Sequence, residues 1–275
     1  MDRPFRQVDV FGSGPYSGNP VAVVLDGRGL SDEDMQRFAN WTNLSETTFV
    51  LPADDPEADY RLRIFTPVAE LPFAGHPTLG SAQAWLGSGG SPRRPNVVVQ
   101  ECGAGLVKLR PTADRVAFEA PPMVRSAPVD EDLVEELAAV FGIDHAAIAD
   151  SHWVDNGPGW VALLLSSADD VLAVRPGFVE RSVGLVGPYP PEGPAAIEVR
   201  AFFPTDDAMV EDPVTGSLNA SVAQWLLSSG RATAPYVASQ GTVLGRAGRV
   251  FIEEHEGSVW VGGAAVTCVE GSVEL

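Results

Sequence analysis

Basic residues are scarce in this chain, which has 18 lysines and arginines against 37 aspartates and glutamates and a formal net charge of −19 at pH 7. A nucleic-acid-binding protein needs a basic surface to displace counterions from the phosphates, so this balance argues against a nucleic-acid partner. It also disfavours docking onto anionic membranes, which attract basic segments. The acidic residues include two dense stretches, 54–59 and 130–136, which we interpret as solvated surface.

Long apolar runs are also missing. No segment approaches the roughly 20 apolar residues of a membrane span, and the first residues lack the apolar core of a signal peptide. We therefore expect a cytoplasmic protein with no membrane partner. Cys102 and Cys268 lie in strand-like surroundings without metal-type spacing, and we expect both to be buried thiols. Four scattered histidines form no H-x-x-x-H motif, so the sequence predicts no metal site.

Glycine and proline are abundant, with 28 and 23 residues, which is typical of a fold with many turns and short strands. One motif containing them occurs twice. Residues 63–67 read R-x-F-x-P and lead to H-P-T-L-G-S at 76–81, whereas 200–204 repeat R-x-F-x-P and lead to D-P-V-T-G-S at 212–217. The repeat predicts two like halves, with the active site between them.

Two predicted helices, 78–86 and 214–227, contain no charged residue. A helix that is apolar on nearly every side must be buried on all sides. The predicted strands are 7–11, 20–25, 46–51, 60–65, 96–100, 105–109 and 115–119 in the first half, and 237–244, 249–253 and 258–261 in the second. Ser31 starts a further helix, with Met35, Phe38, Ala39 and Trp41 on its apolar face, and 130–141 reads as a capped amphipathic helix.

These elements predict an α+β fold of two similar domains, each a mixed β-barrel wrapped around a central apolar helix. The proline-rich break at 120–122 sets the boundary, giving a first domain over 1–121 and a second over 122–264. The C-terminal strand 265–275 is a candidate addition to the first domain. A conventional parallel α/β sheet is the alternative, disfavoured because few amphipathic helices alternate with the strands.

The starts of the two apolar helices are the first candidate site. A helix start offers unpaired N–H groups and the positive end of a dipole, so two of them would hold a carboxylate substrate. Gly75, Gly80 and Gly216 would allow close backbone approach there. His76 and Asp212 stand at equivalent positions, immediately before the helix prolines. Taken singly, Asp212 reads equally well as a helix N-cap and His76 as a structural hydrogen-bonding group.

Glu46 begins a segment that soon turns apolar. A carboxylate there would be half-buried, with its pKa raised into the range of a general acid and base. Local sequence alone favours an exposed glutamate at a strand end, since glutamate is rarely buried. Ser81 and Ser217 lie near the helix starts, and for Ser81 a packing role is the stronger interpretation. Asn19 lies in a Gly-Asn-Pro segment that reads as a plain turn.

The chain resembles the PhzF-like family of phenazine-biosynthesis isomerases. The matching segments are D-V-F at 9–11, S-G-N-P-V-A-V at 17–23, N-L-S-E-T-T-F at 43–49, R-I-F-T-P at 63–67, L-P-F-A-G-H-P-T at 71–78 and E-D-P-V-T-G-S at 211–217. The resemblance implies the fold of diaminopimelate epimerase, in which two barrels each surround a central helix. It also implies a homodimer that needs no cofactor and no metal.

The resemblance assigns the proton-moving role to Glu46 and places His76, Asp212 and Ser217 around a small carboxylate substrate. We therefore expect Glu46, His76 and Asp212 to be the catalytic residues, with His76 and Asp212 orienting the substrate and stabilising charge. The substrate-binding residues we expect are Asn19, Ser45, Gly75, Gly216 and Ser217. Racemase relatives carry two cysteines at the helix starts. Since we expect His76 and Asp212 to hold those places here, we expect no two-thiol inversion.

The predicted function is a cofactor-independent isomerase that moves a proton on a small cyclic carboxylate, similar to the dihydro-hydroxyanthranilate isomerase of phenazine biosynthesis. An epimerase or racemase type of proton transfer is one alternative, and a non-catalytic protein that binds an anionic metabolite is the other. One departure concerns the substrate pocket, because Leu218-Asn219 stands where many relatives have Ala-His.

Overall fold

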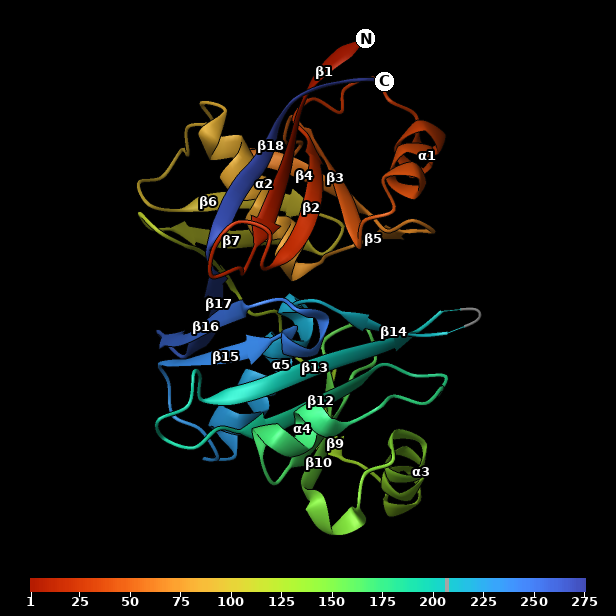
Figure 1. Ribbon diagram of the computed structural model, residues 1–275. Helices are drawn as coiled ribbons and strands as arrows, with labels where there is room; N and C mark the ends of the chain where they lie inside the picture. Colours follow the sequence, from red (N-terminus) through yellow and green to blue (C-terminus); the bar gives the residue numbers. More distant parts are fainter. Residues whose placement is uncertain (206–207) are drawn as a thin grey trace. The chain divides into compact units, whose positions relative to one another are not determined.

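The computed structural model in Figure 1 describes residues 1–205 and 208–275. The chain divides into two compact units. Unit 1 comprises Met1–Glu119 and Gly262–Leu275, and unit 2 comprises Ala120–Val261. The C-terminal strand thus belongs to the same unit as the N-terminus, and Met1 and Leu275 are joined by backbone hydrogen bonds.

The sheet of unit 1 runs in the order β18–β1–β2–β3–β4–β6–β7–β8, with the short β5 paired to the end of β4. The β2–β3 and β4–β6 pairs are parallel and the others are antiparallel. The strands are β1 (Asp2–Val10), β2 (Asn19–Val24), β3 (Glu46–Leu51), β4 (Tyr60–Phe65), β5 (Glu70–Leu71), β6 (Val98–Cys102), β7 (Gly105–Pro111), β8 (Val116–Glu119) and β18 (Ala265–Glu274).

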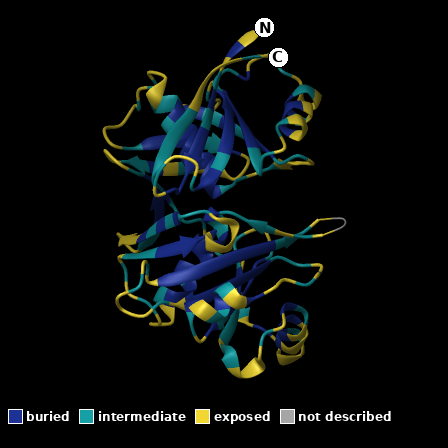
Figure 2. Cartoon of the chain, in the orientation of Figure 1, coloured by how far each residue is buried: buried dark blue, intermediate teal, exposed yellow. Residues whose placement is uncertain are grey.

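Helix α2 (Gly75–Gly87) is the centre of unit 1. It contacts strands from one end of the sheet to the other, including β18, β1, β2 and β8. Most of its residues are buried, as expected of a helix without charge (Figure 2). Helix α1 (Asp32–Thr42) packs on β3 and β4 through Met35, Phe38 and Ala39. Trp41 does not share that buried face, since it is 78% exposed.

Unit 2 repeats this topology, with the order β9–β10–β11–β12–β13–β15–β16 and β14 paired beside β13. Its parallel pairs, β11–β12 and β13–β15, match β2–β3 and β4–β6. The elements are β9 (Arg125–Pro128), α3 (Glu131–Phe141), β10 (Ile148–Asp155), β11 (Val161–Leu165), α4 (Ala168–Ala173), β12 (Val183–Pro188), β13 (Ile197–Pro204), β14 (Met209–Asp212), α5 (Gly216–Ser228), β15 (Tyr236–Gln240), β16 (Gly248–His255) and β17 (Ser258–Gly263).

The predicted α+β class, the internal repeat and the two central apolar helices are confirmed. The predicted barrels need one correction. In each unit the sheet wraps around its helix without closing, and among the described strand pairings none joins β18 to β8. The strand predicted over 237–244 is too long, because Gly241 turns the chain at a φ of +88° and a short 3₁₀ turn follows.

The start of α5 also differs from the prediction. Helix α2 begins at Gly75 and holds Pro77 in its first turn, as expected of a proline without an N–H to donate. Helix α5 begins only at Gly216, because β14 continues through Asp212 and Pro213 follows the end of a strand.

Three further expectations concern the cysteines, membrane-spanning helices and metal sites. Cys102 is buried, but Cys268 on the outer strand β18 is half-exposed, so the prediction of two buried thiols is wrong for Cys268. Within the described part of the chain, no helix is long and apolar enough to cross a membrane. The same residues contain no group of three or more histidine, cysteine, aspartate or glutamate side chains that could hold a metal ion.

Candidate active site

An arginine–glutamate pair, buried in unit 2 and partly exposed in unit 1, anchors the same hairpin in each unit. In unit 1, Arg63 Nε and Nη2 donate to the two carboxylate oxygens of Glu70 at 2.8 and 2.6 Å. In unit 2, Arg200 donates in the same way to Glu211 at 2.9 and 2.8 Å. Each arginine also holds the neighbouring helix, Arg63 through Asp32 at the start of α1 and Arg200 through two carbonyls at the end of α4.

This pair fixes which residues of the two units are equivalent. Glu70 and Glu211 each stand five residues before the helix start, at Gly75 and Gly216. His76 therefore corresponds to Ser217, the second residue of α5, and Asp212 corresponds to Leu71. The predicted equivalence of His76 and Asp212 is wrong. Its cause is the hairpin length, since Arg200 and Glu211 are 11 positions apart whereas Arg63 and Glu70 are 7 apart.

In unit 1 the fold brings together three of the predicted residues. Glu46 is the first residue of β3, Asn19 the first of β2 and His76 the second of α2. His76 Nδ1 lies 3.3 Å from Glu46 Oε2 and 3.5 Å from Asn19 Nδ2. The side chains of His76 and Glu46 are 4% and 15% exposed, so the local interpretation of an exposed Glu46 is wrong. Asn19 is fully buried in a strand and not part of a plain turn.

Burial dominates the electrostatics of His76. It lowers the pKa of the imidazole from 6.5 to about 3, and a hydrogen bond with the backbone of Pro20 opposes this only in part. The ring is therefore neutral near pH 7 and carries one proton. An ionised Glu46 can only accept, whereas Asn19 Nδ2 can only donate, and the shorter contact with the carboxylate favours the tautomer with the proton on Nδ1. The other nitrogen, Nε2, is buried and has no hydrogen-bond partner among the described residues.

Ser45 and Gly75 lie next to Glu46 and His76 in the chain, half-buried and buried respectively. Gly80 and Ser81 lie further along α2 and serve packing. The Ser81 hydroxyl bonds Thr48 Oγ1 at 2.8 Å, and a Cβ at Gly80 would overlap Val21 of β2. The packing role of Ser81 is confirmed. Gly80 allows close approach of strand β2, whereas we had expected it to allow close approach of a ligand.

In unit 2 the carboxylate of Asp212 is held by the residue before α5. Thr215 Oγ1 donates to Asp212 Oδ2 at 2.6 Å, and Thr215, not Asp212, is the N-cap residue. The interpretation of Asp212 as the cap is therefore wrong. Neither helix start has a side-chain cap, so the first-turn N–H groups of α2 and α5 receive no such bond.

Ser217 lies at the second position of α5, after the buried Gly216. Its Oγ accepts a hydrogen bond from Trp160 Nε1 at 3.1 Å, and its carbonyl accepts one from Asn156 Nδ2 at 2.9 Å. The hydroxyl thus keeps its own proton to donate to a ligand. Asn156 was not among the predicted residues, and the loop between β10 and β11 gives no local signal for it.

A family model described as phenazine biosynthesis-like protein, PhzC-PhzF, matches residues 8–271. The chain belongs to this family. A fission yeast (Schizosaccharomyces pombe) protein named antisense-enhancing sequence 1 is 36% identical over 98% of both chains. The trans-2,3-dihydro-3-hydroxyanthranilate isomerase of Pseudomonas fluorescens is 32% identical, again over 98% of both. The solved structure of a predicted epimerase from Pseudomonas aeruginosa superposes with a TM-score of 0.82 at 27% identity, covering 99% of each chain. The family thus includes proteins named as isomerases and epimerases.

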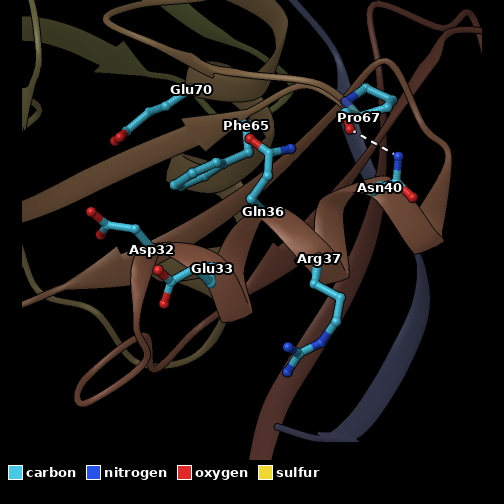
Figure 3. A pocket seen from close by; sticks show the side chains of 8 residues that line it. All are labelled: Asp32, Glu33, Gln36, Arg37, Asn40, Phe65, Pro67 and Glu70. Atoms are coloured by element: carbon cyan, nitrogen blue, oxygen red, sulfur yellow. Dashed lines mark hydrogen bonds between the residues drawn. The ribbon is translucent and has the colours of Figure 1, made fainter.

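A separate surface hollow of about 610 Å³ lies in unit 1 between α1 and the β4–β5 turn (Figure 3). Its lining residues are Asp32, Glu33, Gln36, Arg37, Asn40, Phe65, Pro67 and Glu70. Asn40 Nδ2 donates to the Pro67 carbonyl at 3.0 Å across one end of it. Neither Glu46 nor His76 lines this hollow, so it is distinct from the candidate site.

Proposed function

We propose that the protein is a cofactor-independent isomerase that moves a proton on a small cyclic carboxylate. Trans-2,3-dihydro-3-hydroxyanthranilate, the substrate in the name of the P. fluorescens relative, is the compound we propose to test first. The observation that carries this proposal is the contact of 3.3 Å between the Glu46 carboxylate and a buried His76. A carboxylate with little exposure, beside a neutral imidazole, is suited to gain and lose a proton.

In the proposed reaction, Glu46 takes a proton from a ring carbon next to an unsaturated system. The electron pair of that C–H bond moves into the ring as the double bond shifts. Glu46 then returns the proton to another carbon, so that atoms and charge balance without a co-reactant. His76 orients the Glu46 carboxylate through Nδ1 and offers Nε2 to a polar group of the substrate.

This geometry favours one acid/base group over the two-base alternative. Epimerisation by two bases needs one on each face of the reacting carbon. Glu46 and His76 are too close, at 3.3 Å, to stand on opposite faces of a carbon atom. They serve together as a single proton-transfer position, which supports a proton shift in preference to a racemase reaction. A protein that only binds an anionic metabolite would gain nothing from the Glu46 carboxylate, since like charges repel.

For unit 2 we propose that Asp212, Gly216 and Ser217 contribute to substrate binding. The support is the hydroxyl proton of Ser217 together with the uncapped N–H groups at the start of α5, which suit a carboxylate. Ser45, Gly75 and Asn19 take the corresponding part in unit 1. That the enzyme is a cytoplasmic homodimer stays a prediction, and sedimentation of the purified protein tests the dimer.

The test is Glu46→Gln, with turnover of trans-2,3-dihydro-3-hydroxyanthranilate followed in D₂O. We expect kcat to fall by about 10²–10⁴, the usual contribution of a general acid or base, and deuterium incorporation into product to stop. Glu33→Gln, an exposed glutamate on α1, is the matched control and should retain both. Full turnover and unchanged deuterium incorporation by Glu46→Gln would show that Glu46 does not move the proton.

A further inference from the structure

Gln240, near the start of α5, forms four hydrogen bonds through its side-chain amide. It is fully buried at the end of β15. Its Oε1 accepts from the Thr215 N–H at 3.0 Å and from Asn219 Nδ2 at 2.7 Å. Its Nε2 donates to the Asp212 carbonyl at 3.1 Å and to Thr215 Oγ1 at 3.0 Å. Both donor hydrogens and both acceptor positions of the amide are thus occupied.

These hydrogen bonds allow only one orientation of the Gln240 amide. Turning the amide over would set its NH₂ group against two donors and its oxygen against the Asp212 carbonyl. Since Gln240 donates to Thr215 Oγ1, the threonine hydroxyl is free to give its own proton to Asp212 Oδ2, the bond of 2.6 Å. Gln240 thus donates to Thr215, and Thr215 donates to the Asp212 carboxylate. The second hydrogen bond from Gln240 Nε2 also fixes the backbone carbonyl of Asp212.

Asn219 completes the arrangement. Its Nδ2 donates to Gln240 Oε1 and to the Thr215 carbonyl at 2.9 Å, and the residue is 2% exposed. Asn219, which stands where many relatives have histidine, therefore holds the Gln240 amide in place within unit 2. We propose that Gln240 is a positioning residue that sets the Asp212 carboxylate for substrate binding. This inference rests on the proposed function, which assigns Asp212 to the substrate.

Unit 1 contains a matched control. Gln100 on β6 is also fully buried, donates to Thr78 Oγ1 at 3.0 Å and accepts from the Tyr60 hydroxyl at 3.0 Å. It bonds no residue that we assign to substrate or proton transfer. The Thr78 hydroxyl can turn round to donate, whereas the Asp212 carbonyl cannot. An ionised glutamate at 100 could therefore keep a donor on each oxygen, whereas an ionised glutamate at 240 would face the Asp212 carbonyl.

The charged groups next to Gln240 are the buried Glu198 on β13 and Arg249 on β16, which pair with the preceding residue Ser239, and Arg249 also donates to the Gly248 carbonyl. The strand partners of Gln240 itself are Val199 on β13 and Gly248 on β16, and α5 has no charged residue. Arg246 lies beside the adjacent Gly241 in the following turn. Asp212 is the one titratable residue among the hydrogen-bond partners of Gln240 described above, so a carboxyl introduced at 240 should report on Asp212.

The experiment compares wild type, Gln240→Glu, Gln100→Glu, Thr215→Val and Asp212→Asn. We expect kcat/KM of Gln240→Glu for trans-2,3-dihydro-3-hydroxyanthranilate to fall at least tenfold as pH rises through the ionisation of the new carboxyl. The loss should appear mainly in KM. Thr215→Val should raise KM at every pH, whereas Gln100→Glu should keep the wild-type pH profile. In the ¹³C NMR spectrum, the Asp212 carboxyl signal of Gln240→Glu should show an additional titration step.

Two results overturn the inference in different ways. A wild-type pH profile and an unaltered Asp212 carboxyl signal in Gln240→Glu, with a clear defect in Asp212→Asn, would refute the positioning role and leave the proposed function standing. Full activity of Asp212→Asn would remove Asp212 from the proposed function and the inference with it. The NMR measurement uses the protein alone, so it decides the positioning role whatever the substrate.

Discussion

Acid should destabilise this protein through His76. Burial lowers the pKa of its ring from 6.5 to about 3. Between these two values the unfolded chain binds a proton at this position that the folded chain does not. The free energy of unfolding therefore rises with pH across this window, by up to about 1.4 kcal/mol per pH unit and by roughly 5 kcal/mol in total. Above pH 6.5 the contribution of His76 is constant.

The assay is urea unfolding at a series of pH values from 4 to 8, together with ¹⁵N NMR of the ring. His76→Gln removes the ionisation, so below pH 6.5 its unfolding free energy should depend less on pH than that of wild type. His145→Gln is the control. That histidine is 57% exposed and contacts Glu131, so its removal should leave the steep dependence in place.

One specific result would refute this reasoning. Glu46 Oε2 lies 3.3 Å from His76 Nδ1, and an ionised carboxylate at that distance favours the imidazolium. A ring pKa at or above 6.5 would mean that this attraction outweighs burial. The same conclusion would follow if His76→Gln and wild type lost stability in parallel on acidification.

Two further predictions concern stability and are measured by urea unfolding at pH 7. Arg200→Met should cost about 3–5 kcal/mol, because it leaves the carboxylate of Glu211, 9% exposed, without its partner, whereas Arg63→Met should cost about 1 kcal/mol because Glu70 is 43% exposed. Equal losses of unfolding free energy in the two variants would contradict the difference in burial between Glu211 and Glu70. Gly80→Ala should cost about 1–3 kcal/mol, because its methyl group would overlap Val21 and lie 3.0 Å from Val10 Cγ2. Gly14→Ala meets no atom within 4 Å and is its control, so a neutral Gly80→Ala would show that α2 and β2 can separate at no cost.

Local signals were enough for much of the fold. The predicted strands 46–51 and 60–65 match β3 and β4 residue for residue. Ser31 caps α1 through the Asp34 N–H, as its sequence pattern indicates. The two uncharged helices were found because a helix without charge must be buried. These features depend on residues near in sequence, where patterning and capping act.

The errors arise where position depends on distant residues. The equivalence drawn between His76 and Asp212 followed matching letters, but the longer β13–β14 hairpin moves Asp212 back to the end of a strand. Asn19 read as a turn because its neighbours are glycine and proline. Its burial follows from strand pairing between β1 and β2, which no local pattern contains. Gln240 gave no signal, since its partners are 21–28 positions away.

The correct equivalence changes what the duplication means for chemistry. In the ladders with β4 and β13, Phe49 pairs with Arg63 and Leu185 with Arg200. Three residues before these partners stand Glu46 in unit 1 and Ser182 in unit 2. Glu46 therefore has no carboxylate counterpart, just as His76 corresponds to a serine.

The repeat preserves the arginine–glutamate anchor, the buried helix start and a glutamine bonded to the fourth helix residue, Thr78 or Asn219. It does not preserve a base. A reaction with two opposed bases would need a proton-transfer group at equivalent places in both halves. One half here combines a carboxylate with an imidazole, whereas the other has a serine at the position of His76 and holds its carboxylate, Asp212, at the end of β14 in a bond with Thr215. This asymmetry is what a single base that removes and returns the same proton requires, and it supports the proposed isomerase over a racemase on grounds independent of the 3.3 Å contact between Glu46 and His76.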